Sequence, residues 1–235
     1  MRMYVLDDAF FPTGYAAGAV AKADSALRRQ YLACSTMPVV GPLKKHWCFR
    51  NLRQGETLSY AVAVSEQGER IDLTGNIDGD RLMLDLDDAR YMLYFFVTTP
   101  QATGGRADSY TNLLVKESVR ILLDTVYEAH YARYKEDFGG VFAGFFSDES
   151  SFMSVSRYDQ ILGTDGPLPW SVYFTDQFSE KLGRDAILSL PDLFADMGES
   201  TMPVRYAYMD LISELYRENM SRQVGDWCAQ HGVEY

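Results

Sequence analysis

The sequence predicts an α/β protein, a partial (β/α)8 barrel of the TIM type into which a small antiparallel β-sheet is inserted. One observation is the run from Val141 to Phe146, which is apolar or glycine throughout and is typical of a strand covered on both faces by helices. A long helical repeat precedes this strand, as expected of a parallel sheet. A third observation is the change, between residues 39 and 100, to short β-rich runs broken by glycine and aspartate turns.

The bulk composition is that of a globular protein. Of 235 residues, 47% are hydrophobic and 23% are charged, which excludes a disordered or fibrous chain. The net charge of -11 argues against a nucleic-acid partner, because phosphate binding depends on Lys and Arg. No segment approaches the roughly 20 apolar residues of a membrane span, so we expect no membrane partner. No signal-peptide pattern follows Met1, which indicates a cytoplasmic location if Met1 is the genuine start.

The cysteines and histidines indicate neither a disulfide framework nor a zinc site. Cys34, Cys48 and Cys228 are odd in number and lack CxxC spacing. The histidines lie far apart without HExxH spacing, and His130 sits on a helical pattern where packing is its expected role. We therefore assign no metal ligand among them.

The first predicted domain covers residues 1–38. An apolar strand over residues 3–6 runs directly into a pair of aspartates. A loop of small residues and turn formers follows over residues 10–18. Asp24 is then expected to cap a short helix over residues 26–33.

The second predicted domain, residues 39–100, is a β-rich subdomain inserted into the α/β framework. Its alternating runs are separated by turns rich in glycine and aspartate. The clearest predicted strands cover residues 58–64, 71–74, 81–84 and 91–97.

The third predicted domain, residues 101–235, continues the barrel helices and strands. A helical repeat runs from Leu113 to Phe138, where two glycines end it before the Val141 strand. The elements expected after this strand are a loop with Gly163, Gly166, Pro167 and Pro169, a helix over 171–182 ended by Gly183, a short apolar element over 188–194, a helix over 203–231 and a strand that opens at Val233. A closed barrel needs eight strands and roughly 250 residues, so we expect a segment that requires the rest of its own barrel.

Several ordered blocks along the chain carry a resemblance to a known family. They are Asp7-Asp8, Pro12-Thr13-Gly14, Ala16-Ala17-Gly18, Asp72-Leu73-Thr74, Phe138-Gly139, Phe146-Ser147-Asp148-Glu149, Leu168-Pro169-Trp170, Phe178, Leu182-Gly183, Leu190-Pro191-Asp192-Leu193, Arg205, Trp227-Cys228 and His231-Gly232. Together they resemble the large bacterial glycoside hydrolases of the α-L-rhamnosidase type (family 106-like), over nearly the whole chain. The chain departs from the family pattern with Asp8 for Glu, Thr13 for Ser, Ala17 for Gly and Ser150 for Pro.

The resemblance implies glycoside hydrolysis by carboxylate acid and base chemistry. One carboxyl group protonates the leaving oxygen, and a second attacks the sugar or activates water. Glu149, by resemblance and by its place after a buried strand, is the candidate general acid, while the second carboxylate is expected from a later strand. Adjacent strand residues point to opposite sides, so Asp148 is expected to bind a sugar hydroxyl, orient a loop or cap a helix. For both Asp148 and Glu149 the alternative is a role as a helix cap or as a loop residue that faces water.

Four further residues are candidates for contact with substrate. Asp7 and Asp8 are expected to hold sugar hydroxyls or a calcium ion, which rhamnosidase-like enzymes can use, and capping of the following loop is the alternative. Tyr15 and Trp170 are candidate platforms for a sugar face, with packing under their loops as the alternative.

We therefore expect a segment of a glycoside hydrolase that cleaves O-glycosidic bonds in a carbohydrate partner, with α-L-rhamnosides as candidate substrates. One alternative is a non-catalytic carbohydrate-binding or degenerate barrel fragment. The other is a structural segment that assembles with the remainder of its barrel.

Overall fold

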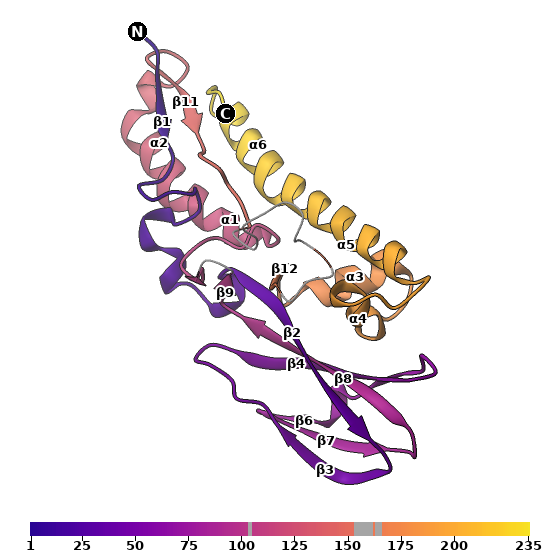
Figure 1. The fold of residues 1–235 in the computed structure, drawn as a ribbon. Helices are drawn as coiled ribbons and strands as arrows, with labels where there is room; N and C mark the ends of the chain where they lie inside the picture. The colour runs from indigo at the N-terminus through magenta and orange to yellow at the C-terminus, as the bar shows by residue number, and fades with distance from the viewer. Residues whose placement is uncertain (103–104, 153–161, 163–165) are drawn as a thin grey trace. The chain divides into compact units, whose positions relative to one another are not determined.

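The computed structural model describes residues 1–102, 105–152, 162 and 166–235. Within it the chain forms two compact units, each with its own core. The first unit consists of Met1–Arg29, Arg106–Met153 and Ile212–Tyr235, and the second of Gln30–Gly105 and Ser154–Leu211 (Figure 1). Gly163, part of the loop expected before residue 168, lies outside the described residues.

Parallel strands form the centre of the first unit. Strand β1 (Met3–Leu6) pairs with β11 (Phe142–Phe146). Near the C-terminus, Glu234 adds a parallel bridge to Gly144, with two backbone hydrogen bonds of 2.9 and 3.0 Å to β11. Because all three segments run in the same direction, their carboxyl ends lie at the same edge.

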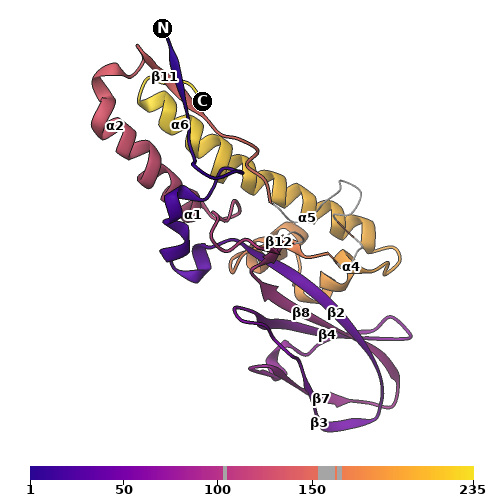
Figure 2. The same cartoon turned by 60° about the vertical axis from the view of Figure 1, so that its left-hand side comes forward.

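Helices run alongside β1 and β11 (Figures 1 and 2). These elements are α1 (Lys116–Leu122), the π-helical η5 (Leu123–Tyr127), α2 (Glu128–Tyr134), η6 (Lys135–Asp137), the π-helical η9 (Arg217–Arg222) and α6 (Gln223–Gln230), together with the short turns η1 (Ala16–Gly18), η2 (Val20–Lys22) and η3 (Ser25–Leu27). No helix among the described residues is long and apolar enough to cross a membrane.

An aromatic-rich core joins these helices to the strands of the first unit. Tyr127 stacks on Phe145 with ring centroids 4.0 Å apart, and Trp227 packs edge-on against Tyr127 at 5.3 Å. Burying a side chain such as Phe145 contributes about 1.5–3 kcal/mol. The cluster therefore supplies much of the attraction that holds the helices against β11.

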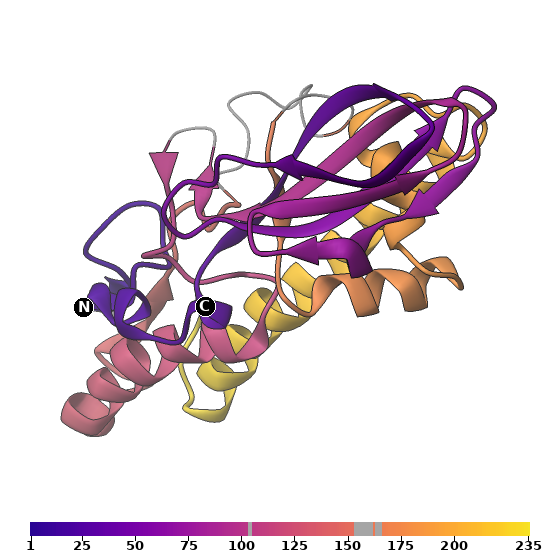
Figure 3. The ribbon, with the colours of Figure 1, turned by 90° about the horizontal axis from the view of Figure 1, so that it is seen from below.

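Antiparallel strands form the second unit. Their order is β12-β2-β8-β4-β5 in the larger sheet and β3-β7-β6 in the smaller one, and Figure 3 views the long strands from below. The bounds are β2 (Gln30–Val40), β3 (Leu43–Phe49), β4 (Thr57–Ser65), β5 (Arg70–Asp72), the turn η4 (Thr74–Asn76), β6 (Ile77–Asp78), β7 (Arg81–Leu86), β8 (Arg90–Thr99) and β12 (Leu168–Trp170). The short strands β9 (Gln101–Ala102) and β10 (Gly105–Arg106) form a separate pair.

The core of the second unit contains side chains from both of its larger sheets. Strand β7 shows why, since Leu82, Leu84 and Leu86 are buried while Met83 and Asp85 between them are not. Successive strand residues point to opposite faces, so this alternation buries one face of β7 against β4 and β8.

Helices also belong to the second unit, and a buried ion pair joins them to β5. They are α3 (Phe174–Leu182), η8 (Ile187–Ser189), α4 (Leu190–Phe194) and the part of α5 (Thr201–Tyr216) up to Leu211. The Arg70 guanidinium donates to the Asp192 carboxylate at 2.5 Å and to Leu188 O at 2.7 Å. Ser200 Oγ donates to the same carboxylate at 2.6 Å, so the fully buried Asp192 is well satisfied.

The expected partial (β/α)8 barrel is wrong. Parallel pairing within the described residues is confined to β1 with β11 and to single bridges from Phe138 and Glu234 to β11, and these residues form no closed barrel. Most of the strands pair antiparallel instead. The apolar run at Val141 predicts a covered strand but does not specify how many parallel neighbours it has. The long strands after residue 30 pair their backbone N–H and C=O groups with antiparallel neighbours, and such pairs need no crossover helices.

The helix expected over residues 26–33 is also wrong. A single 3₁₀ turn follows Asp24, whose carboxylate accepts the Ala26 N–H at 2.9 Å. Strand β2 then begins at Gln30, because it pairs with β8 along almost its whole length and buries Tyr31 and Leu32. These tertiary contacts outweigh the weak propensity of a short helix.

Other predicted elements are confirmed. Strand β11 occupies the apolar run that predicted it, and α3 ends at Leu182 with Gly183 in the left-handed region at φ 66°. The two long helical repeats are present, but each contains a π-helical segment, η5 or η9. Apolar spacing alone does not distinguish a π turn from an α turn.

We predict that Gly144→Ala destabilises the first unit. A Cβ at this position would lie 2.2 Å from Glu234 O, so the last segment must move away from β11. The free energy of unfolding in urea should fall by about 1–3 kcal/mol. Gly225→Ala in α6 is the matched control, since its Cβ would meet no described atom within 4 Å beyond its chain neighbours and its own helix backbone, and helix propensity favours alanine by about 0.5–1 kcal/mol. Equal stability of Gly144→Ala and the wild type would contradict this packing.

We predict that Asp192→Ala destabilises the second unit by about 3–5 kcal/mol, because it leaves the largely buried Arg70 charge without its carboxylate partner. Asp85→Ala is the control in the same unit. It removes the exposed Lys44 ion pair, whose side chains are 67% and 50% accessible, and should lower the free energy of unfolding far less than Asp192→Ala does. Similar losses for the two variants in urea unfolding would contradict the role of the buried pair.

Candidate functional site

The ends of β1 and β11 bring two acidic segments together. Asp7 directly follows β1, and its N–H donates to Phe146 O at 3.1 Å, which extends the parallel pairing past the strand. Asp148 and Glu149 follow β11 after Ser147. Carboxylates from two distant parts of the sequence therefore belong to one strand-end region.

The carboxylate of Asp7 accepts three hydroxyl hydrogen bonds. Thr13 Oγ1 donates to Oδ1 at 2.8 Å, the Tyr127 hydroxyl donates to Oδ2 at 2.6 Å, and Ser147 Oγ also donates to Oδ2. Asp7 is 0% exposed. Its acceptor capacity, about four sites in a carboxylate, is thus directed mostly at the protein's own hydroxyl groups.

Burial changes the proton affinity of this cluster. It raises the pKa of Asp7, an effect that the three hydroxyl donors oppose and the charge of Asp8 increases. Burial also raises the pKa of Tyr127, and the nearby Asp7 carboxylate adds to the shift. Burial raises the pKa of Tyr235 to about 12, although its hydrogen bond with Ser147 acts in the opposite direction. Both phenols remain protonated at neutral pH.

The carboxylate of Asp8 organises the loop that follows β1. Its Oδ1 accepts the Ala9 N–H at 2.8 Å, and its Oδ2 accepts the N–H groups of Gly14 at 3.0 Å and Ala16 at 2.8 Å. Gly14 has a φ of 129°, and a Cβ there would lie 2.6 Å from Thr111 Oγ1. These contacts correspond to the loop-capping alternative for Asp8.

Thr13 joins that loop to the residues after β11. Its Oγ1, besides donating to Asp7, accepts the Asp148 N–H at 2.9 Å, and its own N–H donates to Asp148 O at 2.9 Å. Thr13 is buried and Asp148 partly buried. The backbone of Asp148 is therefore fixed on both its N–H and its C=O.

Glu149 is the exposed carboxylate of the group. Its backbone has a φ of 43°, in the left-handed region that costs a non-glycine residue about 1–2 kcal/mol. Neighbouring contacts must offset that cost. Such backbone positions are concentrated at functional sites.

The two aromatic candidates lie in different units. Tyr15, partly buried in the first unit, contacts Phe10 and Tyr110 with ring centroids 4.8 and 5.9 Å apart, and Phe10 is 59% exposed. Trp170 lies in the second unit, where it is 1% exposed and packs on Phe174 at 4.4 Å. Core packing, the alternative for Trp170, describes its surroundings.

The calcium ion considered for Asp7 and Asp8 would meet competition from protein donors. Each of their four carboxylate oxygens already accepts at least one hydrogen bond. Among residues 1–102, 105–152, 162 and 166–235, no group of three or more His, Cys, Asp or Glu side chains is arranged to hold a metal ion. Calcium takes six to eight oxygen ligands, so binding here would require these carboxylates to exchange partners.

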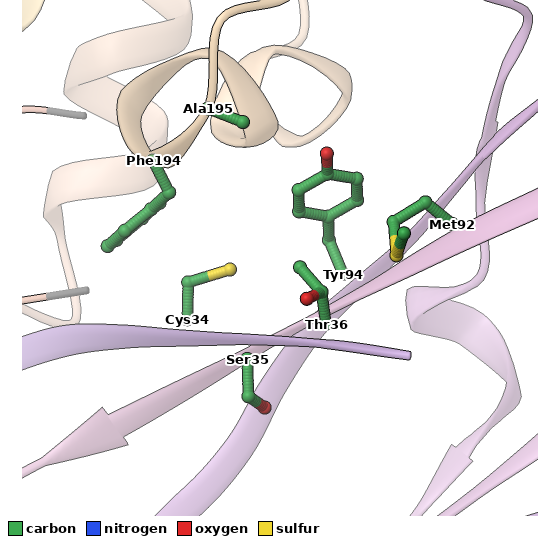
Figure 4. Close-up of a pocket in the computed structure, with 7 residues that line it drawn as sticks. All are labelled: Cys34, Ser35, Thr36, Met92, Tyr94, Phe194 and Ala195. Atoms are coloured by element: carbon green, nitrogen blue, oxygen red, sulfur yellow. The ribbon is translucent and has the colours of Figure 1, made fainter. Parts of the chain in front are cut away.

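A cavity of about 270 Å³ lies in the second unit (Figure 4). Its lining residues are Cys34, Ser35, Thr36, Met92, Tyr94, Phe194 and Ala195. The Tyr94 hydroxyl donates to Met197 Sδ at 3.7 Å. These described lining residues include no carboxylate, so they do not supply the acid and base groups that glycoside hydrolysis requires.

The sequence did not identify the donors around Asp7. Tyr127 lies within the helical repeat predicted from Leu113 to Phe138, and its partner Asp7 is 120 residues away. Thr13 and Ser147 stand in the sequence blocks that carry the resemblance, which implies no role for either. The one local signal was the proximity of hydroxyl residues to the two strand-end aspartates, which is common in ordinary loops.

No protein-family model and no curated protein matches the sequence. Among solved structures, the chain is similar to a rhamnosidase from Novosphingobium sp. PP1Y, with 18% sequence identity and a TM-score of 0.42. The similarity covers 73% of this chain, which spans about 16% of the length of the rhamnosidase. The rhamnosidase is thus a distant structural neighbour, and this similarity does not assign the chain to its family.

We predict that Asp7→Asn changes how stability depends on pH. Because burial raises the pKa of Asp7 above its usual 3.8, the folded state binds the proton more tightly than the unfolded state. The resulting stability is fully present below the unfolded pKa and is lost as pH rises through the folded pKa. Asparagine cannot ionise, so the free energy of unfolding of the variant, relative to the wild type, should be greater at pH 7 than at pH 4.

Tyr127→Phe provides the opposite control, because it removes a donor that lowers the pKa of Asp7. Its loss of stability between pH 4 and pH 7 should exceed that of the wild type. Urea unfolding at both pH values measures the two differences. If the difference in unfolding free energy between Asp7→Asn and the wild type were the same at both pH values, the raised pKa of Asp7 would be contradicted.

Proposed function

We propose that this chain is a segment of a glycoside hydrolase of the α-L-rhamnosidase-like type, with Glu149 as its general acid and a carbohydrate as its partner. The observation that carries the proposal is the difference in burial among the carboxylates at the strand ends. Asp7 and Asp8 are buried and accept protein hydrogen bonds, whereas Glu149, at the end of the neighbouring strand, is exposed. It is therefore the group best able to meet a substrate.

The chemistry assigned to Glu149 is protonation of the glycosidic oxygen as the bond breaks. A second carboxylate, about 5 Å away for retention or about 6.5–9.5 Å for inversion, attacks the anomeric carbon or activates water. Asp7 is unsuited to that second role because its oxygens are buried among hydroxyl donors. In this proposal another part of the enzyme supplies the second carboxylate.

A non-catalytic carbohydrate-binding function is the second candidate. The aromatic group of Phe10, Tyr15 and Tyr110 favours it, because aromatic faces can stack on sugar rings and Phe10 is 59% exposed. This candidate predicts that Tyr15→Ala weakens sugar binding in calorimetric titration, while no variant of Glu149 alters hydrolysis.

The leaving-group dependence of Glu149→Gln tests the catalytic proposal in the full-length protein. An alkyl α-L-rhamnoside needs protonation of its leaving group, whereas the 4-nitrophenyl glycoside does not. Kcat for the alkyl substrate should fall by about 10²–10⁴-fold, with a much smaller loss for the aryl substrate. Steady-state kinetics on both substrates measures the difference.

Glu136→Gln is the matched control, since Glu136 is an exposed glutamate at the end of the α2 region in the same unit. It should leave both rates unchanged. Equal losses on the two substrates in Glu149→Gln would remove the acid role. Sugar binding without hydrolysis in the wild type would favour the second candidate.

A further inference from the structure

The hydrogen bonds of Asp7 converge on the segment immediately before Glu149. Its Oδ2 accepts Ser147 Oγ directly. Its Oδ1 accepts Thr13 Oγ1, which in turn accepts the Asp148 N–H at 2.9 Å. The two residues that precede Glu149 are thus both tied to one carboxylate, the first directly and the second through Thr13.

Asp7 also accepts a hydrogen bond from the helical part of the first unit. The Tyr127 hydroxyl, on the π-helical segment η5, donates to Oδ2 at 2.6 Å, and the Tyr127 ring stacks on Phe145. A π-helical turn re-aims side chains relative to a regular helix, and such turns are frequent at functional sites. Asp7 therefore connects the rigid core of the first unit to the strand-end segment.

The backbone of Glu149 needs such support. Its φ of 43° is unfavourable for a residue with a Cβ, so this conformation persists only when the surrounding structure fixes it. Two hydrogen bonds hold Asp148, the residue before Glu149. Its N–H donates to Thr13 Oγ1 and its C=O accepts the Thr13 N–H, each at 2.9 Å. They thereby help to set the direction in which the Glu149 side chain leaves the backbone.

We infer that Asp7 is a positioning residue that acts through Thr13 and Ser147 to hold the Glu149 carboxylate in the direction needed to protonate a glycosidic oxygen. The inference rests on the proposed function and assigns Asp7 a role other than contact with sugar. Asp7 is 0% exposed, so it meets the substrate only through the residues it orients. Misplacement of a catalytic group by about 1 Å can cost 10²-fold in rate.

The matched pair Thr13→Val and Thr13→Ser tests this chain of contacts without removing the buried charge. Valine has the shape of threonine but lacks the hydroxyl, so both side-chain hydrogen bonds are lost. Serine retains them. On the alkyl rhamnoside, Thr13→Val should lower kcat by about 10–100-fold with little change in KM. Thr13→Ser should restore kcat to within about threefold of the wild type.

The double variant Thr13→Val with Glu149→Gln separates positioning from a general structural effect. If Thr13 acts through Glu149, adding Thr13→Val to the Glu149→Gln variant should lower kcat by less than about threefold. Independent, multiplicative losses would overturn the inference. So would a Thr13→Val enzyme with wild-type kcat.

Amide hydrogen exchange at Asp148 distinguishes failure of this inference from failure of the proposed function. Asp7→Asn and Thr13→Val should accelerate exchange of that amide, while the amide of Phe145, which donates to Glu234 O at 3.0 Å in the core, should keep its wild-type rate. Unchanged exchange at Asp148 overturns positioning even if Glu149→Gln behaves as an acid variant. Accelerated exchange with no leaving-group effect in Glu149→Gln supports the mechanical link and rejects the catalytic role.

Discussion

The buried carboxylate of Asp7 is the constraint on which the strand-end region depends. A carboxylate removed from water is costly unless donors replace the lost solvent, and here three hydroxyl groups do so. These donors come from the loop after β1, from the π-helical segment η5 and from the residue after β11. The hydrogen bonds to one carboxyl group therefore fix three segments that are far apart in the sequence. Glu149 lies two residues after Ser147, which belongs to one of these segments.

In the first unit, apolar packing and hydrogen bonding have different effects. The aromatic cluster around Phe145 and Trp227 supplies stability through burial of large side chains. The hydrogen bonds of Asp7 contribute less net free energy each, about 0.5–1.5 kcal/mol, or about 1.5–3 kcal/mol where a charge is involved, but they require specific directions. The close approach of Glu234 to Gly144 then completes the parallel alignment of the strand ends. Packing thus forms the unit, and the hydroxyl network sets the geometry of its acidic edge.

The sequence revealed the parts of this protein whose signals are local. A covered strand over 142–146, the helix end at Gly183 and the acidic strand ends all follow from short patterns. The prediction of a partial barrel was wrong, because the number and direction of strand neighbours depend on pairings such as β2 with β8, which join residues tens of positions apart. The role of Asp7 was inaccessible for the same reason, since Tyr127 is its donor from 120 residues away.

A pH titration by NMR tests the link between Asp7 and the Glu149 segment most directly. The chemical shift of the Asp7 carboxyl carbon should report a midpoint above the ordinary aspartate value, because burial raises its pKa. The Asp148 amide, joined to Asp7 through Thr13, should shift with the same midpoint, and this response should be lost in Thr13→Val. An Asp148 amide that does not follow the titration of Asp7 would contradict the account.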